Sequence, residues 1–208
     1  MKKIYLILII TGFMLMSGAS AGLADTLNLL TLPSTTYGGY YVGGVGGNLN
    51  GGYAMKFYCN DFAATTYVPG SFAVAVSTLS DLSQTKFGGT TNALSKYQQA
   101  GWLISQMESN PSQVGPIQYA LWNVFNSSAP DPAGSANWLN AAQNINPANF
   151  DFSSVRVYTP TDTNNQEFMN GGVTAVPEPS VVFLLIFGLA GLGLFKWKLR
   201  KKTAGKVF

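Results

Sequence analysis

Two short runs contain the side chains most able to take part in bond-forming chemistry. Residues 57–61 read Phe-Tyr-Cys-Asn-Asp and contain Cys59, the only cysteine of the sequence, and residues 117–122 read Ile-Gln-Tyr-Ala-Leu-Trp and contain Gln118. The thiolate form of a cysteine is a strong nucleophile. The sequence has no histidine, which excludes Ser/His/Asp and Cys/His catalysis and imidazole metal ligands. We therefore expect no metal site and no cofactor, and a lone cysteine forms no internal disulfide.

The two runs together resemble the signature pair of bacterial thioester domains, which are adhesin modules of surface proteins. In that family a cysteine that follows an aromatic residue is joined, side chain to side chain, to the glutamine of a Gln-x-Ala-(Ile/Leu)-Trp run. Residues 97–103, Tyr-Gln-Gln-Ala-Gly-Trp-Leu, are similar to the helix that separates the two motifs there. The resemblance covers residues 53–125. It implies a thioester between Cys59 and Gln118 that attaches the protein to amines or hydroxyls of a target surface.

The implied chemistry needs a nucleophile, a proton acceptor and an oxyanion donor. The thiolate attacks the Gln118 carboxamide carbon and expels ammonia, and an amine or hydroxyl later displaces the sulfur. Without histidine, proton transfer would use water, Asp61, or a tyrosine such as Tyr58 or Tyr119. Backbone N–H groups at the start of the helix that carries Gln118 would stabilise the oxyanion. A second interpretation stays open, in which Cys59 is a small apolar core residue and Gln118 only caps or solvates its helix.

Periodicity places the two runs on a strand and a helix. Alternation predicts strands over 26–31, 54–59, 71–78 and 154–159, with Cys59 at the last inward position of the second. Apolar spacing predicts three helices, over 92–109 and from about 115 and 135, and puts Gln118 in the first turn of the second. This order predicts an α+β fold: a small β-sheet or sandwich with an inserted helical block.

Residues 37–53 contain eight glycines, most of them paired and next to tyrosines. Such a composition predicts turns and loops and not a packed element. A phosphate-binding loop is the functional alternative, but no Gly-Lys-Ser/Thr sequence follows it. The tyrosines of this segment either stack on sugars or pack within the loops themselves. They are Tyr37, Tyr40, Tyr41 and Tyr53.

The C-terminal end has three features in a fixed order. Pro177, Glu178 and Pro179 come first, an apolar span over 180–199 predicts a single transmembrane helix, and a basic tail over 196–208 follows. The cations expected to stop the chain at the membrane are Lys196, Lys198, Arg200, Lys201 and Lys202. Together these features resemble the PEP-CTERM sorting signal of Gram-negative bacteria. The resemblance implies processing by an exosortase and delivery to the cell surface or exopolysaccharide, whereas a permanent tail anchor is the alternative.

The N-terminal end has the pattern of a secretory signal peptide, with Lys2 and Lys3 before an apolar run and small residues. We expect cleavage after Ala21 or Ala24. The sequence then divides into a signal peptide (1–24), an extracytoplasmic α+β domain (25–160), a polar linker (161–175) and the sorting signal (176–208). Before processing, the C-terminal helix would hold the exported domain at the inner membrane.

The charge of the central part limits its partners. Residues 25–175 contain four basic and eight acidic residues, a net charge of −4. Such a domain lacks the basic patch that neutralises phosphates, so we expect no nucleic-acid partner. The carboxylates are few and show no recognisable pairing, and we expect no enzyme. The sequence predicts an exported surface or exopolysaccharide-associated protein, either a covalent adhesin through Cys59 and Gln118 or a structural biofilm component without a reactive site.

Overall fold

The structure is a computed structural model and describes residues 24–175. Six antiparallel strands form a closed barrel in the order β1-β4-β5-β9-β8-β6. These strands are β1 (Asp25–Thr31), β4 (Val45–Leu49), β5 (Met55–Cys59), β6 (Gly70–Ser77), β8 (Arg156–Pro160) and β9 (Phe168–Asn170). The predicted combination of a small sheet and a helical block is confirmed, but the sheet is a closed barrel and not an open sheet or a sandwich.

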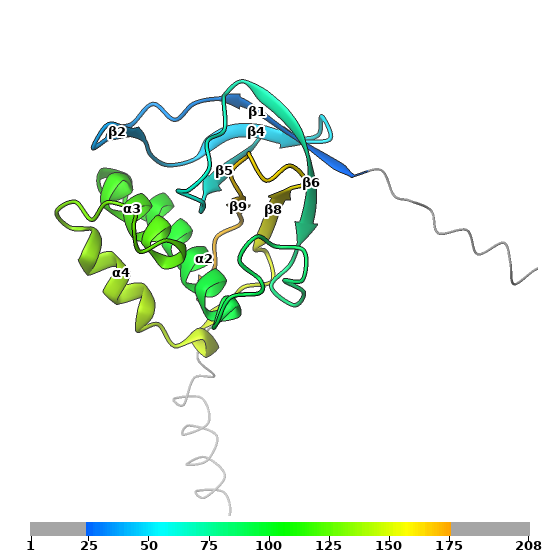
Figure 1. The fold of residues 1–208 in the computed structure, drawn as a ribbon. Helices are drawn as coiled ribbons and strands as arrows, with labels where there is room; N and C mark the ends of the chain where they lie inside the picture. The colour runs from blue at the N-terminus through cyan, green and yellow to red at the C-terminus, as the bar shows by residue number, and fades with distance from the viewer. Residues whose placement is uncertain (1–23, 176–208) are drawn as a thin grey trace, which may run out of the picture.

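The helical block is inserted between β6 and β8 and lies against one side of the barrel (Figure 1). Its α-helices are α2 (Ala93–Ser109), α3 (Val114–Phe125) and α4 (Ser135–Gln143), close to the predicted spans. The short elements are β2 (Thr36–Tyr37), β3 (Tyr40–Tyr41), β7 (Phe150–Asp151), β10 (Thr174–Ala175) and the 3-10 turns η1 (Pro111–Gln113) and η2 (Pro147–Asn149). The strands β2 and β3 form a separate hairpin that covers one end of α3.

The strand β5 is buried on both of its faces. Phe57 and Cys59 point into the barrel core, where the Phe57 ring meets Tyr158 edge to face at 5.0 Å. Tyr58 points the other way into the core that the helices form, and only 4% of its surface is exposed. Alternation places Tyr58 on the face opposite Cys59, and a strand pattern alone does not reveal that a helical layer covers that face.

The glycine-rich segment contains a barrel strand that the sequence did not predict. In β4, Gly47 lies directly between β1 and β5 and pairs with Leu29 and Met55. A Cβ atom on Gly47 would lie 2.2 Å from the carbonyl oxygen of Asn28. The glycines of β4 therefore serve close approach of two backbones next to a register shift in β1, and this requirement removes the apolar alternation by which strands are recognised.

The predicted linker over 161–175 is also different in the structure. Residues 168–170 form β9, which pairs with both β5 and β8 and completes the barrel. Phe168 and Met169 are buried on opposite faces, one in each core. A strand of three residues is too short to show a periodic pattern, and the polar residues before it concealed its burial. The domain therefore continues beyond the predicted boundary at residue 160.

Within residues 24–175, no helix has the length and apolar character needed to span a membrane. The predicted signal peptide, the Pro177-Glu178-Pro179 motif, the transmembrane helix and the basic tail lie outside the described residues and stay predictions at the structural level.

We expect the substitution Gly47→Ala to lower the free energy of unfolding by about 1–3 kcal/mol, because the added methyl group would press on the backbone of β1. Gly89→Ala is the matched control, since an added Cβ at Gly89 would have no neighbour within 4 Å. Chemical denaturation monitored by circular dichroism measures both. Equal stability of the two variants would contradict the close packing of β4 on β1.

Candidate functional site

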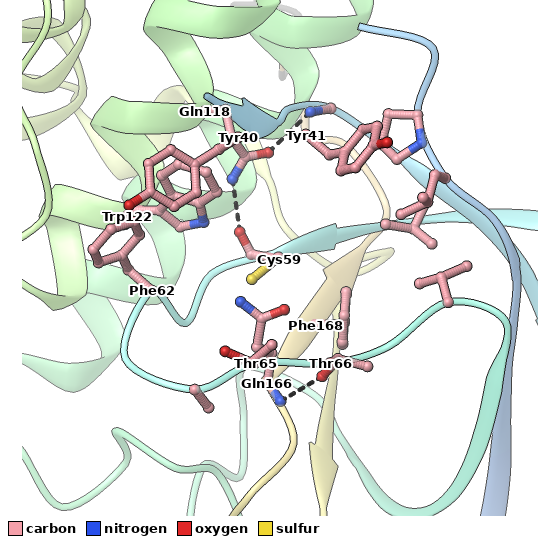
Figure 2. Close-up of a pocket in the computed structure, with 16 residues that line it drawn as sticks. Tyr40, Tyr41, Cys59, Phe62, Thr65, Thr66, Gln118, Trp122, Gln166 and Phe168 are labelled. Atoms are coloured by element: carbon pink, nitrogen blue, oxygen red, sulfur yellow. Dashed lines mark hydrogen bonds between the residues drawn. The ribbon is translucent and has the colours of Figure 1, made fainter. Parts of the chain in front are cut away.

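Cys59 and Gln118 come together where the end of β5 meets α3. Gln118 is the fifth residue of α3, slightly further along the helix than predicted, and 1% of its surface is exposed. Its side-chain Nε2 donates a hydrogen bond to the carbonyl oxygen of Cys59 at 2.8 Å. Figure 2 shows this bond beside the Cys59 sulfur. The fold therefore brings together two residues that lie 59 positions apart in sequence.

The other end of the Gln118 carboxamide is held by the glycine-rich segment. The backbone N–H of Gly43 donates to Gln118 Oε1 at 3.3 Å. Gly43 has a φ of +97°, and a Cβ atom there would lie 2.9 Å from Val114 Cγ1. The sequence predicted oxyanion donors at the start of α3, but the donor that contacts this oxygen comes from Gly43. Nothing in a row of paired glycines distinguishes this position from its neighbours.

The Cys59 thiol is buried and donates a hydrogen bond from Sγ to the carbonyl oxygen of Asp61 at 3.2 Å. Burial raises the pKa of this thiol to about 12, and the charges of Asp61 and Glu167 act in the same direction. The indole N–H of Trp122 lies near enough to favour the thiolate slightly, although Nε1 makes no hydrogen bond of good geometry in the described part of the chain. At neutral pH the group is therefore a thiol.

The structure assigns the predicted proton acceptors to other contacts. Asp61 is fully buried and forms an ion pair with Lys86 at 2.5 Å. The Tyr58 hydroxyl lies on the opposite face of β5 and donates to Glu108 at 3.2 Å. The Tyr119 hydroxyl donates to the carbonyl oxygen of Tyr37 at 3.0 Å. None of these three predicted acceptors lines the cavity at Cys59.

Glu167 is a buried carboxylate next to the site that the sequence did not reveal. Glu167 is completely buried and accepts four hydrogen bonds from neutral donors. These donors are Asn60 Nδ2 at 2.8 Å, the Tyr97 hydroxyl at 2.7 Å, the Lys86 backbone N–H at 2.7 Å and Thr159 Oγ1 at 2.6 Å. They join the segment after Cys59 to α2 and β8. Glu167 lies in the stretch predicted to be a polar linker, where no pattern marks it as buried.

A cavity of about 280 Å³ opens at Cys59 and Gln118. Its walls include aromatic rings, Tyr40, Tyr41, Phe62 and Trp122, and small polar groups, Thr65, Thr66 and Gln166. In Figure 2, Cys59 lies between the group formed by Tyr40, Phe62 and Trp122 and the side chain of Gln166. None of the residues that line the cavity is charged. The site can therefore admit a small neutral group to the immediate vicinity of the sulfur.

Residues 175–201 match the family model of the PEP-CTERM protein-sorting motif. This match confirms the predicted sorting signal and implies that the protein is exported to the cell surface. The matched segment is a small part of the chain and lies almost entirely beyond the described residues. A search of the curated proteins finds no match.

The predicted similarity to bacterial thioester domains is also found among solved structures. The N-terminal thioester domain of a surface protein from Clostridium perfringens, in a cysteine-to-alanine mutant, is 12% identical with a TM-score of 0.48, over 73% of this chain and 99% of that one. The same domain without the mutation has 11% identity and a TM-score of 0.45, over 72% and 99%. The N-terminal domain of the Streptococcus pyogenes pilus tip adhesin Cpa has 12% identity and a TM-score of 0.44, over 76% and 97%.

We expect Glu167→Gln to lower the free energy of unfolding by about 1–3 kcal/mol, because an amide nitrogen would replace one acceptor oxygen and leave buried donors unsatisfied. Glu108→Gln is the control. Glu108 is exposed, and the amide oxygen of the substituted glutamine could still accept from Tyr58. We therefore expect the free energy of unfolding to change by no more than about 0.5 kcal/mol. Urea denaturation of both variants measures the difference. Equal losses of unfolding free energy would show that the hydrogen bonds of Glu167 do not stabilise the fold.

The raised pKa of Cys59 predicts slow alkylation of the folded protein. In a Gln118→Ala variant, which cannot form a thioester, we expect iodoacetamide at pH 8 to modify Cys59 at least roughly 100-fold more slowly than in the same variant unfolded in guanidinium. The folded rate should keep rising with pH between 8 and 11, whereas the unfolded rate should level off above about pH 9. A folded rate that levels off near pH 9 would contradict the buried, neutral thiol.

Proposed function

We propose that this exported surface protein stores a thioester between Cys59 Sγ and Gln118 Cδ and uses it for covalent attachment to a target. The observation that carries the proposal is the double anchoring of the Gln118 carboxamide, by the Cys59 carbonyl oxygen at one end and the Gly43 N–H at the other. This arrangement holds the carboxamide carbon in a fixed orientation beside the residue that supplies the nucleophile.

Formation of the bond balances without an external base. The sulfur attacks Cδ, the carbonyl oxygen becomes an oxyanion that accepts from the Gly43 N–H, and the C–N bond breaks. The proton of the thiol is transferred to the departing nitrogen, so that ammonia leaves. Because the thiol itself supplies the proton, the step needs neither a histidine nor Asp61, Tyr58 or Tyr119, which are engaged in other contacts.

Burial then protects the product. A thioester is neutral, so it avoids the desolvation that raises the pKa of the Cys59 thiol. A thiolate that is poorly stabilised is also a poor leaving group, which slows hydrolysis of the stored bond. The protein makes one bond and is consumed in doing so, and for this reason we describe it as an adhesin and not as an enzyme.

A purely structural role is the second candidate, as a non-covalent component of a biofilm or exopolysaccharide matrix. The same contacts are also compatible with this role, because Gln118 is hydrogen-bonded at both ends and Cys59 is a buried, protonated thiol. In that role Gln118 would only bridge β5, α3 and the glycine-rich segment. Processing by an exosortase belongs to both candidates, since it depends on the sorting signal alone.

Intact-mass measurement of the purified protein separates the two candidates. A thioester predicts a mass lower by one ammonia than the sequence requires, and gain of one methylamine at Gln118 after incubation with that amine. Cys59→Ala and Gln118→Ala should each abolish both effects. An unmodified mass, together with alkylation of Cys59 on unfolding, would exclude the covalent adhesin and leave the sorting signal untouched.

Gln166→Ala is the matched control, because Gln166 is a second glutamine that lines the cavity, with its Nε2 bonded to the Asp61 carbonyl oxygen at 2.9 Å. We expect this variant to keep the mass deficit. Loss of the mass deficit in Gln166→Ala and its persistence in Gln118→Ala would show that Gln166, and not Gln118, forms the thioester.

A further inference from the structure

We propose that the cavity beside Cys59 recognises a neutral carbohydrate, and that a sugar hydroxyl is the group that takes the acyl group of Gln118. This inference rests on the thioester proposed above and specifies its acceptor. The alternative acceptor is the amino group of a lysine or a polyamine, which is an ammonium group at neutral pH and reacts only after it loses a proton. Three properties of the cavity distinguish the two: its charge, an unpaired hydrogen-bond donor, and the arrangement of its aromatic rings.

The cavity offers no partner for a cation. Its lining residues are uncharged, although the central domain as a whole is acidic. The two carboxylates whose charges act on Cys59 already have partners: Asp61 forms an ion pair with Lys86, and Glu167 accepts four hydrogen bonds. An ammonium group that entered would lose its hydration without gaining a lining counter-charge, which is strongly unfavourable. A neutral hydroxyl does not incur this cost.

The indole Nε1 of Trp122 is a buried donor that approaches the Cys59 sulfur but makes no hydrogen bond of good geometry in residues 24–175, and Trp122 is only 4% exposed. Buried donors are almost always satisfied, so a lone one that lines a cavity points to a ligand atom that accepts. A hydroxyl oxygen both accepts and donates, whereas an ammonium group only donates. The unpaired indole therefore matches a hydroxyl and not a protonated amine.

The aromatic rings form a platform at the mouth of the cavity. Tyr40 is 44% exposed, and its ring packs on Phe62 at 5.3 Å and on Trp122 at 5.8 Å between ring centroids. Thr66 and Gln166 add a hydroxyl and an amide on the other side of Cys59 (Figure 2). Apolar rings with a few polar groups around them suit a pyranose, which has apolar C–H surface and hydroxyls at its edge. The cavity volume is at the small end of ligand pockets, which suits one sugar unit of a longer chain.

The transfer step balances with the groups present. A sugar hydroxyl oxygen attacks the thioester carbon, a C–O bond forms, the C–S bond breaks, and the hydroxyl proton moves to the departing sulfur. The products are an ester on Gln118 and the free thiol of Cys59. Burial makes the departing thiolate strongly basic, so the sulfur itself takes the proton and no histidine is needed. The Gly43 N–H stabilises the oxyanion as it does during formation.

Binding is tested first, without the thioester, in the Cys59→Ala protein. Calorimetric titration uses tetrasaccharides of glucose, mannose, galactose and N-acetylglucosamine, and the deacetylated form of the last one supplies the same backbone with ammonium groups. We expect at least one neutral tetrasaccharide to bind and the N-acetylated form to bind at least tenfold more tightly than its cationic counterpart. Tyr40→Ala in this background should weaken binding at least tenfold. Tyr53 is 94% exposed and lies outside the cavity lining, so Tyr53→Ala should have no effect.

Covalent transfer is tested next with the unmutated protein. Incubation with the tightest neutral tetrasaccharide should add one tetrasaccharide mass, removable by hydroxylamine as expected for an ester. Tyr40→Ala should reduce this adduct at least tenfold more than it reduces methylamine capture. Capture of methylamine without any sugar adduct would overturn the carbohydrate acceptor while the thioester stands. Absence of the mass deficit, with sugar binding retained in Cys59→Ala, would overturn the thioester and the transfer step but leave carbohydrate recognition. Equal or tighter binding of the cationic tetrasaccharide would overturn the recognition of a neutral carbohydrate.

Discussion

The burial of β5 between two cores is the constraint on which the rest of the structure depends. Phe57 and Cys59 belong to the barrel interior, and Tyr58 between them belongs to the helical core. Because successive side chains of a strand point to opposite faces, a strand buried on both sides fixes the barrel and the helices relative to each other. The last residue of this strand is Cys59, so the position of its sulfur relative to α3 is set by packing and not by a mobile loop.

The polar contacts follow from that arrangement. Where β5 ends, its carbonyl groups no longer have a sheet partner on every side, and buried carbonyl groups require donors. Gln118 supplies one to the carbonyl oxygen of Cys59, and Gln166 supplies one to that of Asp61. Asn60 binds Glu167, whose other donors come from α2, β8 and the segment before α2. Asn60 and Asp61, which follow Cys59, are thus held by hydrogen bonds and are fully buried. The burial of Cys59 beside them explains why its thiol is protonated.

The sequence predicted those parts of the site that have a local pattern. The strand with Cys59 at its inner end and the helix with Gln118 near its start were recognised from alternation and apolar spacing, and α2 and α4 in the same way. The parts that it did not predict depend on contacts between distant residues. Gly47 is a glycine because of the carbonyl oxygen of Asn28, and Gly43 becomes a donor only through its approach to α3. Glu167 is surrounded by four donors, three of which lie 70 or more positions away in the sequence. A closed barrel cannot be recognised when β4 lacks apolar alternation and β9 has only three residues.

The absence of histidine gives the site its chemical character. An enzyme that turns over many times needs a base that is regenerated near neutral pH, which is the role histidine usually fills. A group that reacts once has a weaker requirement, because the proton released in each step can move between the reacting atoms themselves. In the proposed reactions the thiol proton would move to the departing nitrogen during formation, and the acceptor proton would move to sulfur during transfer. A high thiol pKa lowers the fraction of thiolate available for attack and makes the thiolate a poor leaving group, so in the proposed sequence it slows both steps and preserves the stored bond. Under the proposed function, the buried, neutral environment of Cys59 suits storage of an acyl group.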